Sequence, residues 1–229
     1  MDRYVAIIAD IKKSKSTQNR DIIQEKIRHT LNRVNEKYED VIASKFTVSS
    51  GDSFQGLLKN GNQVMNIILE IDLELYPELF AASHHSGIRY GIGIGTLDTE
   101  LYEEDSNLVD GNAYHMARNS VDAVKKSESS RERIVTNFRV SKEGEEDKED
   151  LHLMNSLLSL VSIIKNKWTE DQARVIRMYI ENDYGQLPTA DKLEKSQSTI
   201  SRSLERSSFY SIKESIDALN QSIEKERAE

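Results

Sequence analysis

Residues 45–58, KFTVSSGDSFQGLL, decide how the first part of the chain folds. Apolar and small polar residues roughly alternate on both sides of Gly51 and Asp52, and Gly-Asp is favourable turn chemistry. The pattern therefore predicts a β-hairpin with this pair at its bend. A carboxylate at a hairpin tip stands on a stiff support, as a metal ligand or a catalytic acid must. Asp is also common in turns for purely local reasons, so the hairpin alone leaves both interpretations of Asp52 open.

The segments around the hairpin alternate between strand and helix patterns. A continuous apolar run, residues 4–9, ends at Asp10 and predicts a buried central strand. Apolar spacing predicts helices over residues 21–38, 62–75 and 110–125, with Pro77 ending the second, and strands over 88–97 and 133–136. The order β-α-β-β-α-β, followed by a helix, predicts an α+β domain with a ferredoxin-like arrangement.

This order predicts that two carboxylates meet at one edge of the sheet. A helical crossover makes the second strand run the same way as the first, so Asp10 and the hairpin tip with Asp52 share an edge. Neighbouring strands lie about 5 Å apart, so both acids can bind one Mg²⁺ or Mn²⁺ ion that orients a nucleoside triphosphate. The alternative is two strand-end acids without a shared role. The expected phosphate-binding groups are Lys12, Lys13, Ser14, Lys15 and Gly51.

Composition narrows the class of protein. The chain has 229 residues, a formal net charge of −8 and no cysteine. The absence of cysteine rules out disulfides and Cys-zinc sites and fits a reducing cytoplasm, where we expect the protein to reside. No run of about 18 apolar residues occurs, so no membrane span is expected. The negative charge argues against broad nonspecific binding to nucleic acid but leaves a local patch possible.

The charged run 141–150, SKEGEEDKED, is the best candidate for a domain boundary. We expect a cyclase- or palm-like domain at 1–140, a solvated linker at 141–150 and a helical domain at 151–229. Within the last, TADKLEKSQSTISRSL resembles a helix-turn-helix at about 189–206, with Lys195 where the turn often has glycine. Gln197, Thr199, Ser201 and Arg202 are the polar residues suited to a DNA groove. An amphipathic hairpin used for dimerisation is the alternative.

Two features of the strand 88–97 also have alternative interpretations. Its glycines, Gly91, Gly93 and Gly95, have the spacing G-x-G-x-G within a strand, which is not a dinucleotide fingerprint. We expect close packing against a helix rather than ligand contact. Arg89 has three possible interpretations, as an exposed surface charge, as a member of a salt bridge at the sheet edge, or as a functional group.

Four motifs resemble a known family, in that family's order. ADIKKS (9–14), GDSF (51–54), IRYGIGIGTL (88–97) and VDGNAYHMARNSV (109–121) are similar to motifs of class III nucleotide cyclases, and GDSF also resembles the GDEF of diguanylate cyclases. The cyclase resemblance covers about residues 1–126. The whole chain, with its C-terminal extension, looks most similar to the SatD family.

The resemblance implies roles for individual residues. Asp10, Asp52 and the carbonyl of Ile11 match the metal ligands. Arg118 matches the arginine that stabilises the transition state, which cyclases supply across a dimer interface. Two positions depart from the cyclase pattern, because Tyr114 replaces an asparagine and Val48 a base-reading lysine.

A homodimer is therefore expected, and Met116, Ala117 and Val121 offer an apolar surface near Arg118. The alternative is that Arg118 pairs with Asp122 or Asp110 and only stabilises its helix.

Two classes of function follow. The first is a metal-dependent nucleotide-binding domain joined to a helix-turn-helix that binds double-stranded DNA. Such a protein is a nucleotide-responsive regulator or a nucleotidyl-transfer enzyme acting on nucleoside triphosphates. The second is a catalytically inactive scaffold that acts as a DNA-binding transcriptional regulator. The departure at Tyr114 favours the second class, and the presence of Asp10, Asp52 and Arg118 favours the first.

Overall fold

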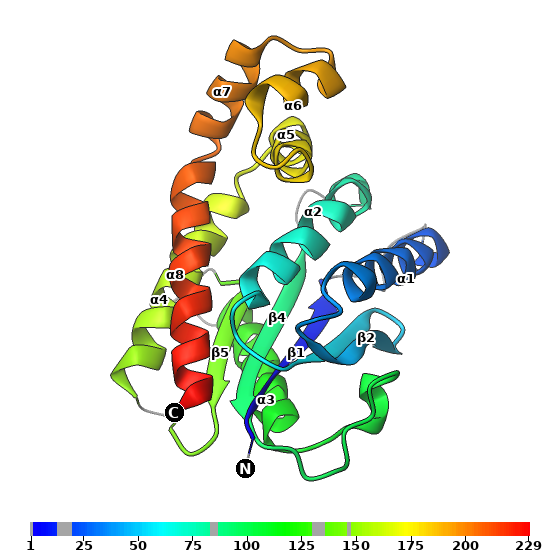
Figure 1. Ribbon diagram of the computed structural model, residues 1–229, viewed down its shortest axis with the longest axis vertical. Coiled ribbons are helices and arrows are strands. Elements are labelled where there is room, and N and C mark those ends of the chain that lie inside the picture. The colour runs from blue at the N-terminus through cyan, green and yellow to red at the C-terminus, as the bar shows by residue number, and fades with distance from the viewer. Residues whose placement is uncertain (1, 13–19, 83–86, 130–135, 146–147) are drawn as a thin grey trace.

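The computed structural model describes residues 2–12, 20–82, 87–129, 136–145 and 148–229, which form one mixed sheet and a set of helices (Figure 1). In chain order the elements are β1 (Tyr4–Ile11), α1 (Arg20–Lys37), β2 (Ile42–Ser50), β3 (Ser53–Leu58), α2 (Val64–Ala82), β4 (Ile88–Gly95), the short 3-10 helix η2 (Ser106–Leu108), α3 (Asn112–Ser129), β5 (Phe138–Lys142), α4 (Glu149–Lys165), α5 (Glu170–Glu181), α6 (Gln186–Leu193), α7 (Gln197–Arg206) and α8 (Phe209–Ala228).

The sheet has the strand order β2-β3-β1-β4-β5. β1 lies in the middle and pairs antiparallel with both β3 and β4, whereas β5 joins β4 in parallel. The β-α-β-β-α-β order expected for the first part of the chain is present, and the hairpin bends at Gly51-Asp52 as predicted. β2 runs parallel to β1 but is not its neighbour, because β3 lies between them.

Both faces of the sheet are covered, which explains the unbroken apolar run of β1. Alternate residues of a strand point to opposite faces. Val5 and Ile7 belong to the large hydrophobic core with α1 and α2, whereas Ala6 and Ile8 belong to a smaller cluster beneath α3. Every one of these four side chains is buried, so β1 shows no polar alternation.

The glycines of β4 allow α3 to lie unusually close to the sheet. A Cβ atom added to Gly91 would lie 1.9 Å from the carbonyl oxygen of Ala117, and one added to Gly93 would lie 2.1 Å from that of Ala113. Since real Cβ atoms essentially never approach so closely, only glycine is compatible with this packing. The expectation of helix packing rather than ligand contact is confirmed for these positions.

Three predicted boundaries are corrected. α2 continues through Pro77 to Ala82, because the apolar pattern continues with buried Leu79 beyond the proline. The last strand of the sheet is β5, which begins at Phe138. Of the predicted strand 133–136, residues 133–135 lie outside the described residues and Thr136 precedes β5.

The third correction concerns the charged run 141–150, which was expected to be solvated. Ser141 and Lys142 belong to β5, and α4 begins at Glu149. The side chain of Lys142 is fully buried and lies 3.0 Å from Glu226 near the end of α8. A lysine can be buried when a carboxylate compensates its charge, a partner that sequence pattern alone did not reveal.

The C-terminal helices share a core with the sheet. α4 packs along β5, and α8 contacts α2, α4 and β4, while α5 to α7 lie beyond one end of the sheet (Figure 1). One hydrophobic core includes Val5 of β1 as well as Ile200 of α7 and Ile223 of α8. No helix in the described part of the chain is both long enough and apolar enough to cross a membrane.

Candidate functional site at the end of strand β1

Asp10 and Asp52 lie at the same end of the sheet. In the pairing of β1 with β3, Asp10 stands opposite Ser53, the first residue of β3. One residue further, the backbone N–H of Ile11 donates to the carbonyl oxygen of Asp52 at 3.2 Å. The strand next to Asp10 is therefore β3, which begins directly after the hairpin bend. The strand before the bend, β2, runs parallel to β1 but does not lie beside Asp10.

The hairpin tip is held by α1. Gly51 has a φ of 51°, in the left-handed region that favours glycine. Its carbonyl oxygen accepts a hydrogen bond from the side-chain amide of Gln24 at 3.0 Å. The bend that carries Asp52 is thus fixed both by its backbone conformation and by a contact with the first helix.

The carboxylate of Asp10 is bound by cationic side chains. Its Oδ2 accepts from Nη1 of Arg89 at 2.7 Å and lies 3.5 Å from Nζ of Lys125, and its Oδ1 accepts from the hydroxyl of Ser53 at 3.3 Å. Arg89 stands directly opposite Asp10 on β4, which places both side chains on the α3 face. Of the alternatives for Arg89, the structure has the edge salt bridge.

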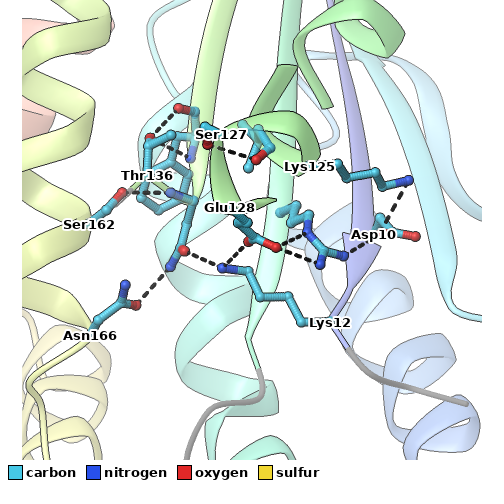
Figure 2. Close-up of polar contacts among 12 residues, drawn as sticks. Asp10, Lys12, Lys125, Ser127, Glu128, Thr136, Ser162 and Asn166 are labelled. Carbon is cyan, nitrogen blue, oxygen red and sulfur yellow. Dashed lines mark hydrogen bonds and ion pairs between the residues drawn. The ribbon is translucent and has the colours of Figure 1, made fainter. Parts of the chain in front are cut away.

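Glu128, near the end of α3, extends this pair into a network (Figure 2). It accepts two hydrogen bonds from Arg89, at 3.1 and 2.8 Å, and lies 2.7 Å from Nζ of Lys12. The same Nζ atom donates to the side-chain oxygen of Asn137 at 2.8 Å. An unbroken chain of polar contacts therefore runs from Asp10 through Arg89, Glu128 and Lys12 to Asn137.

The network shifts the protonation of its members in opposite ways. Burial acts to raise the pKa of Glu128, but hydrogen bonds from Arg89 and Lys12 outweigh it and hold that pKa below its usual value. For Lys12, burial dominates and lowers the pKa, although Glu128 opposes the change. The carboxylate of Glu128 is therefore stabilised by its partners, whereas Lys12 carries its charge at a desolvation cost.

The oxygen ligands at this edge match the chemistry of a hard divalent cation. Mg²⁺ is usually held by one or two carboxylates together with phosphate oxygens and water, and Asp10, Asp52 and the Ile11 carbonyl are groups of that kind. Across the described ranges, no group of three or more His, Asp or Glu side chains is placed to hold a metal ion. A cation held here would need further ligands from phosphate or water, and Asp10 would have to exchange its contacts with Arg89 and Lys125.

The other predicted nucleotide-binding residues are only partly described. Lys12 lies in the network, and Gly51 lies at the bend. Lys13, Ser14 and Lys15 lie outside the described residues.

Arg118 is exposed on α3, without an ion-pair partner among the described residues. It precedes Lys125 by two helical turns, or about 10 Å along the axis, so in one chain it is well separated from Asp10. Asp110 pairs with His115 instead, at 3.5 Å. The expected apolar surface is corrected, because Ala117 and Val121 are buried against β4 and only Met116 of the three is partly exposed.

The two departures from the cyclase pattern point into the protein. Tyr114 is buried in the small cluster beneath α3, and Val48 packs against the main core. Both side chains therefore pack in the protein interior, at positions where the nucleotide cyclases have a polar side chain.

Helices α6 and α7 form a compact pair at the position of the predicted helix-turn-helix. Ala190, Leu193, Ile200 and Leu204 are buried, as the apolar pattern indicated. The left-handed residue of the connection is Glu194, with φ of 53°, one position before Lys195.

Of the predicted DNA-binding residues, Gln197, Thr199 and Arg202 are exposed on α7, and Ser201 is half-buried. The guanidinium of Arg202 folds back along its own helix and donates to the carbonyl oxygen of Ser198 at 3.1 Å.

Sequence reasoning missed Lys125, Glu128 and Asn137 as members of the network. Lys125 and Glu128 lie one turn apart on α3, and this spacing, together with the antiparallel pairing of Asp10 and Arg89, could have placed them together. Asn137 lies 125 positions from Lys12 in the chain and had no comparable signal.

Comparisons with known proteins identify the chain at the level of family. No curated protein matches it. A family model described as the SatD family matches residues 4–218, nearly the whole chain, and the protein therefore belongs to the SatD family.

Proposed function

We propose that the sheet edge formed by the end of β1 and the β2–β3 hairpin binds a nucleoside triphosphate together with a divalent cation. The fold supports the proposal in one respect. A β-α-β-β-α-β order with β1 between β3 and β4, antiparallel to both, is what a ferredoxin-like, cyclase-like domain requires. In this interpretation β5 and the C-terminal helices are additions to that domain.

One observation carries the proposal. Asp10 stands opposite the start of β3 and pairs with Arg89, and the backbone N–H of Ile11 donates to the carbonyl oxygen of Asp52. Two acidic residues distant in sequence therefore share one end of the sheet with the cationic side chains of Arg89 and Lys12. Hard oxygens next to ammonium and guanidinium groups suit a triphosphate that carries a metal ion.

The chain's own residues have distinct tasks in this proposal. A bound Mg²⁺ or Mn²⁺ would supply charge neutralisation of the phosphates, with Asp10, Asp52 and the Ile11 carbonyl as its protein ligands. Arg89 already divides its guanidinium between Asp10 and Glu128, so it can keep the bonds to Glu128 when Asp10 changes partner. Lys12 and Lys125 then face the phosphates as compensating charges.

A homodimer completes the proposal. Arg118 is exposed and about two turns from the Asp10 network of its own chain, so a second chain is the natural source of an arginine for the phosphates. A guanidinium suits this task because it stays charged and can bind phosphate oxygens with two donors. With Tyr114 buried, the asparagine contact of the cyclases has no counterpart, so we assign the site to nucleotide binding first and to nucleotidyl transfer second.

A second function, DNA binding, is supported by the surface of α7. Gln197, Thr199 and Arg202 are exposed on the helix, whereas Ile200 and Leu204 fix its opposite side in the core. A helix anchored in this way presents polar side chains as a recognition helix does. The combination describes a nucleotide-responsive DNA-binding regulator, or a DNA-binding scaffold if the nucleotide site is inactive.

Thermal unfolding with nucleoside triphosphates and Mg²⁺ or Mn²⁺ tests the nucleotide site. A ligand at ten times its dissociation constant stabilises the folded state by about 1.4 kcal/mol, which raises the melting temperature of a chain of this size by about 3–5 °C. Asp52→Asn should abolish that rise. Asp40→Asn is the matched control, because Asp40 is exposed near the opposite end of β2. An unchanged rise in Asp52→Asn would place the site elsewhere.

A mixing experiment tests the dimer. Asp52→Asn and Arg118→Ala chains should each lose the metal-dependent binding, while their mixture should recover one site per heterodimer. Sedimentation that shows only monomers, even with nucleotide and metal present, would contradict the shared site.

A further inference from the structure

A separate cavity of about 200 Å³ lies at the same end of the sheet, between α2 and α4. Lys12 and Ile88 line it from the end of β1 and the start of β4, Asp72 and Tyr76 from α2, and Lys165 from the end of α4. In Figure 2, Lys12 reaches from the end of β1 to Glu128 and to the side of the molecule where Ser162 and Asn166 lie.

Two lysines give the cavity a cationic wall. Lys12 is bonded to Glu128 and Asn137, and Lys165 is paired with Asp72 and lies 4.8 Å from the centre of the Phe138 ring. An ammonium group has three N–H donors. After the bonds to described residues are counted, one donor on Lys12 and two on Lys165 remain for a ligand.

The charged side chains that line the cavity are buried at a desolvation cost. Asp72 is buried and also accepts from the hydroxyl of Tyr90 at 3.1 Å, so part of its charge is already satisfied. Burial raises the pKa of Asp72, against the effect of Lys165, and it lowers the pKa of Lys12. Of the charged side chains that line the cavity, two are lysines and one is Asp72, while Glu128 pairs with Lys12 from outside the lining.

Part of the lining is aromatic. Tyr76 and Phe80 stack with their ring centroids 5.6 Å apart. The polar atoms of the aromatic lining are bonded elsewhere, because the Tyr76 hydroxyl donates to the carbonyl oxygen of Trp168 and Nε1 of Trp168 donates to that of Ser207 at 2.9 Å. These side chains therefore present apolar ring surface to the cavity.

We propose that this cavity binds a small aromatic carboxylate, with its carboxylate on Lys12 and Lys165 and its ring against Tyr76 and Trp168. Its volume of about 200 Å³ is the space of about seven water molecules in the liquid, which admits a one-ring acid but not a nucleotide. A few fixed polar groups within an otherwise apolar lining are typical of small-molecule sites. The proposal shares Lys12 with the proposed nucleotide site and otherwise uses different residues.

Benzoate is the probe, and Trp168 is the reporter because it is the single tryptophan of the chain. Titration should change its fluorescence saturably, with a dissociation constant of about 1 mM, as expected for a ligand of so few atoms. At ten times that concentration the melting temperature should rise by about 3–5 °C. Acetate and inorganic phosphate test the requirement for the ring, since each provides the charge without it.

Two variants keep the test independent of folding defects. Lys165→Met should weaken benzoate binding at least tenfold, and Lys167→Met, at the exposed position two residues on, should leave it unchanged. Since Lys165→Met leaves Asp72 without its cation, Leu79→Phe provides a second variant that fills the cavity and retains both lysines. Leu79→Phe should abolish benzoate binding.

Three results would overturn the proposal. The first is the absence of a saturable signal with benzoate up to about 10 mM. The second is unchanged binding in both Lys165→Met and Leu79→Phe. The third is equal binding of acetate or phosphate, which would identify a general anion site. Asp52→Asn should bind benzoate normally, so this experiment and the nucleotide experiment fail separately.

Discussion

The buried ion pair between Lys142 and Glu226 should anchor the C-terminal helix to the sheet. The two side chains are 0 % and 1 % exposed and lie 3.0 Å apart, and they join β5 to the last turn of α8 across 84 positions of the chain. We predict that Lys142→Met, which keeps most of the apolar stem, destabilises the protein because it leaves the carboxylate of Glu226 buried with only Lys148 as a partner.

The magnitude follows from the partners that remain. Removing one member of a buried ion pair costs about 3–5 kcal/mol when the other is left uncompensated. Here each member keeps a partly exposed second partner, Lys148 at 2.9 Å for Glu226 and Glu145 at 3.0 Å for Lys142. We therefore expect about 2–3 kcal/mol for Lys142→Met and for Glu226→Met, at or just below the lower end of that range.

The double variant separates charge from packing. With Lys142→Met and Glu226→Met together, no charge stays buried at this place, and Lys148 and Glu145 still pair with each other at 3.0 Å near the surface. Its stability should lie within about 1 kcal/mol of the unmodified protein, because apolar replacement of a buried pair is often neutral. The coupling energy of the cycle should then be at least about 3 kcal/mol.

Urea unfolding followed by Trp168 fluorescence and by circular dichroism measures these values, and coincident transitions are needed for a two-state treatment. With a slope of about 2.5 kcal/mol/M, each single variant should lower the midpoint by about 1 M. Single variants within about 0.5 kcal/mol of the unmodified protein, as for ordinary surface positions, would refute the reasoning. Residues 141–150 would then behave as the solvated linker that their composition suggests.

Three further perturbations test the packing and the sites. Gly93→Ala should destabilise the protein by about 2 kcal/mol or more, because its Cβ would lie 2.1 Å from a carbonyl oxygen of α3, whereas Gly87→Ala, with its nearest atom at 3.9 Å, should be nearly neutral in the same urea assay. Glu128→Gln should reduce the loss of stability on acidification below about pH 4.5. The folded state holds the pKa of Glu128 below its unfolded value of 4.5, so its contribution is present above that pH and is lost as the pH falls through the folded pKa. Stability curves of equal steepness in acid would contradict this. Arg202→Ala should weaken low-salt binding to duplex DNA while Arg174→Ala on α5 should not, and equal affinity for both variants would leave α6 and α7 as a dimerisation element.

Local patterns predicted the first part of the fold because its signals are local. The hairpin has turn residues at its bend, β1 is a short apolar run, and α1 has helical spacing, so each could be recognised without knowledge of its neighbours. β5 and α8 are different. Lys142 looks like a surface residue until Glu226 is placed beside it, and nothing within residues 138–148 indicates that partner.

The candidate site also has a part that the sequence predicted and a part that it did not. The common edge of Asp10 and Asp52 followed from the order of elements, since a helical crossover and a hairpin fix which strand ends coincide. Their electrostatic environment could not be predicted in this way, because Arg89 lies on β4 and Glu128 lies on α3. In the sequence, Arg89 was compatible with several roles. Topology can place backbone ends, but pairing of side chains depends on rotamers and on contacts across the fold.

The close packing of α3 determines which parts of the site can move. Gly91 and Gly93 bring the helix backbone against β4, and closely packed contacts of this kind resist displacement by more than tenths of an ångström. Glu128 lies on the same helix, two turns beyond Val121. A ligand that takes Asp10 must work through side-chain exchange, and Arg89 is the group suited to it, since it bonds Asp10 with one nitrogen and Glu128 with the other two. In the proposed site, Glu128 would be the acceptor to which Arg89 stays bonded while Asp10 is released.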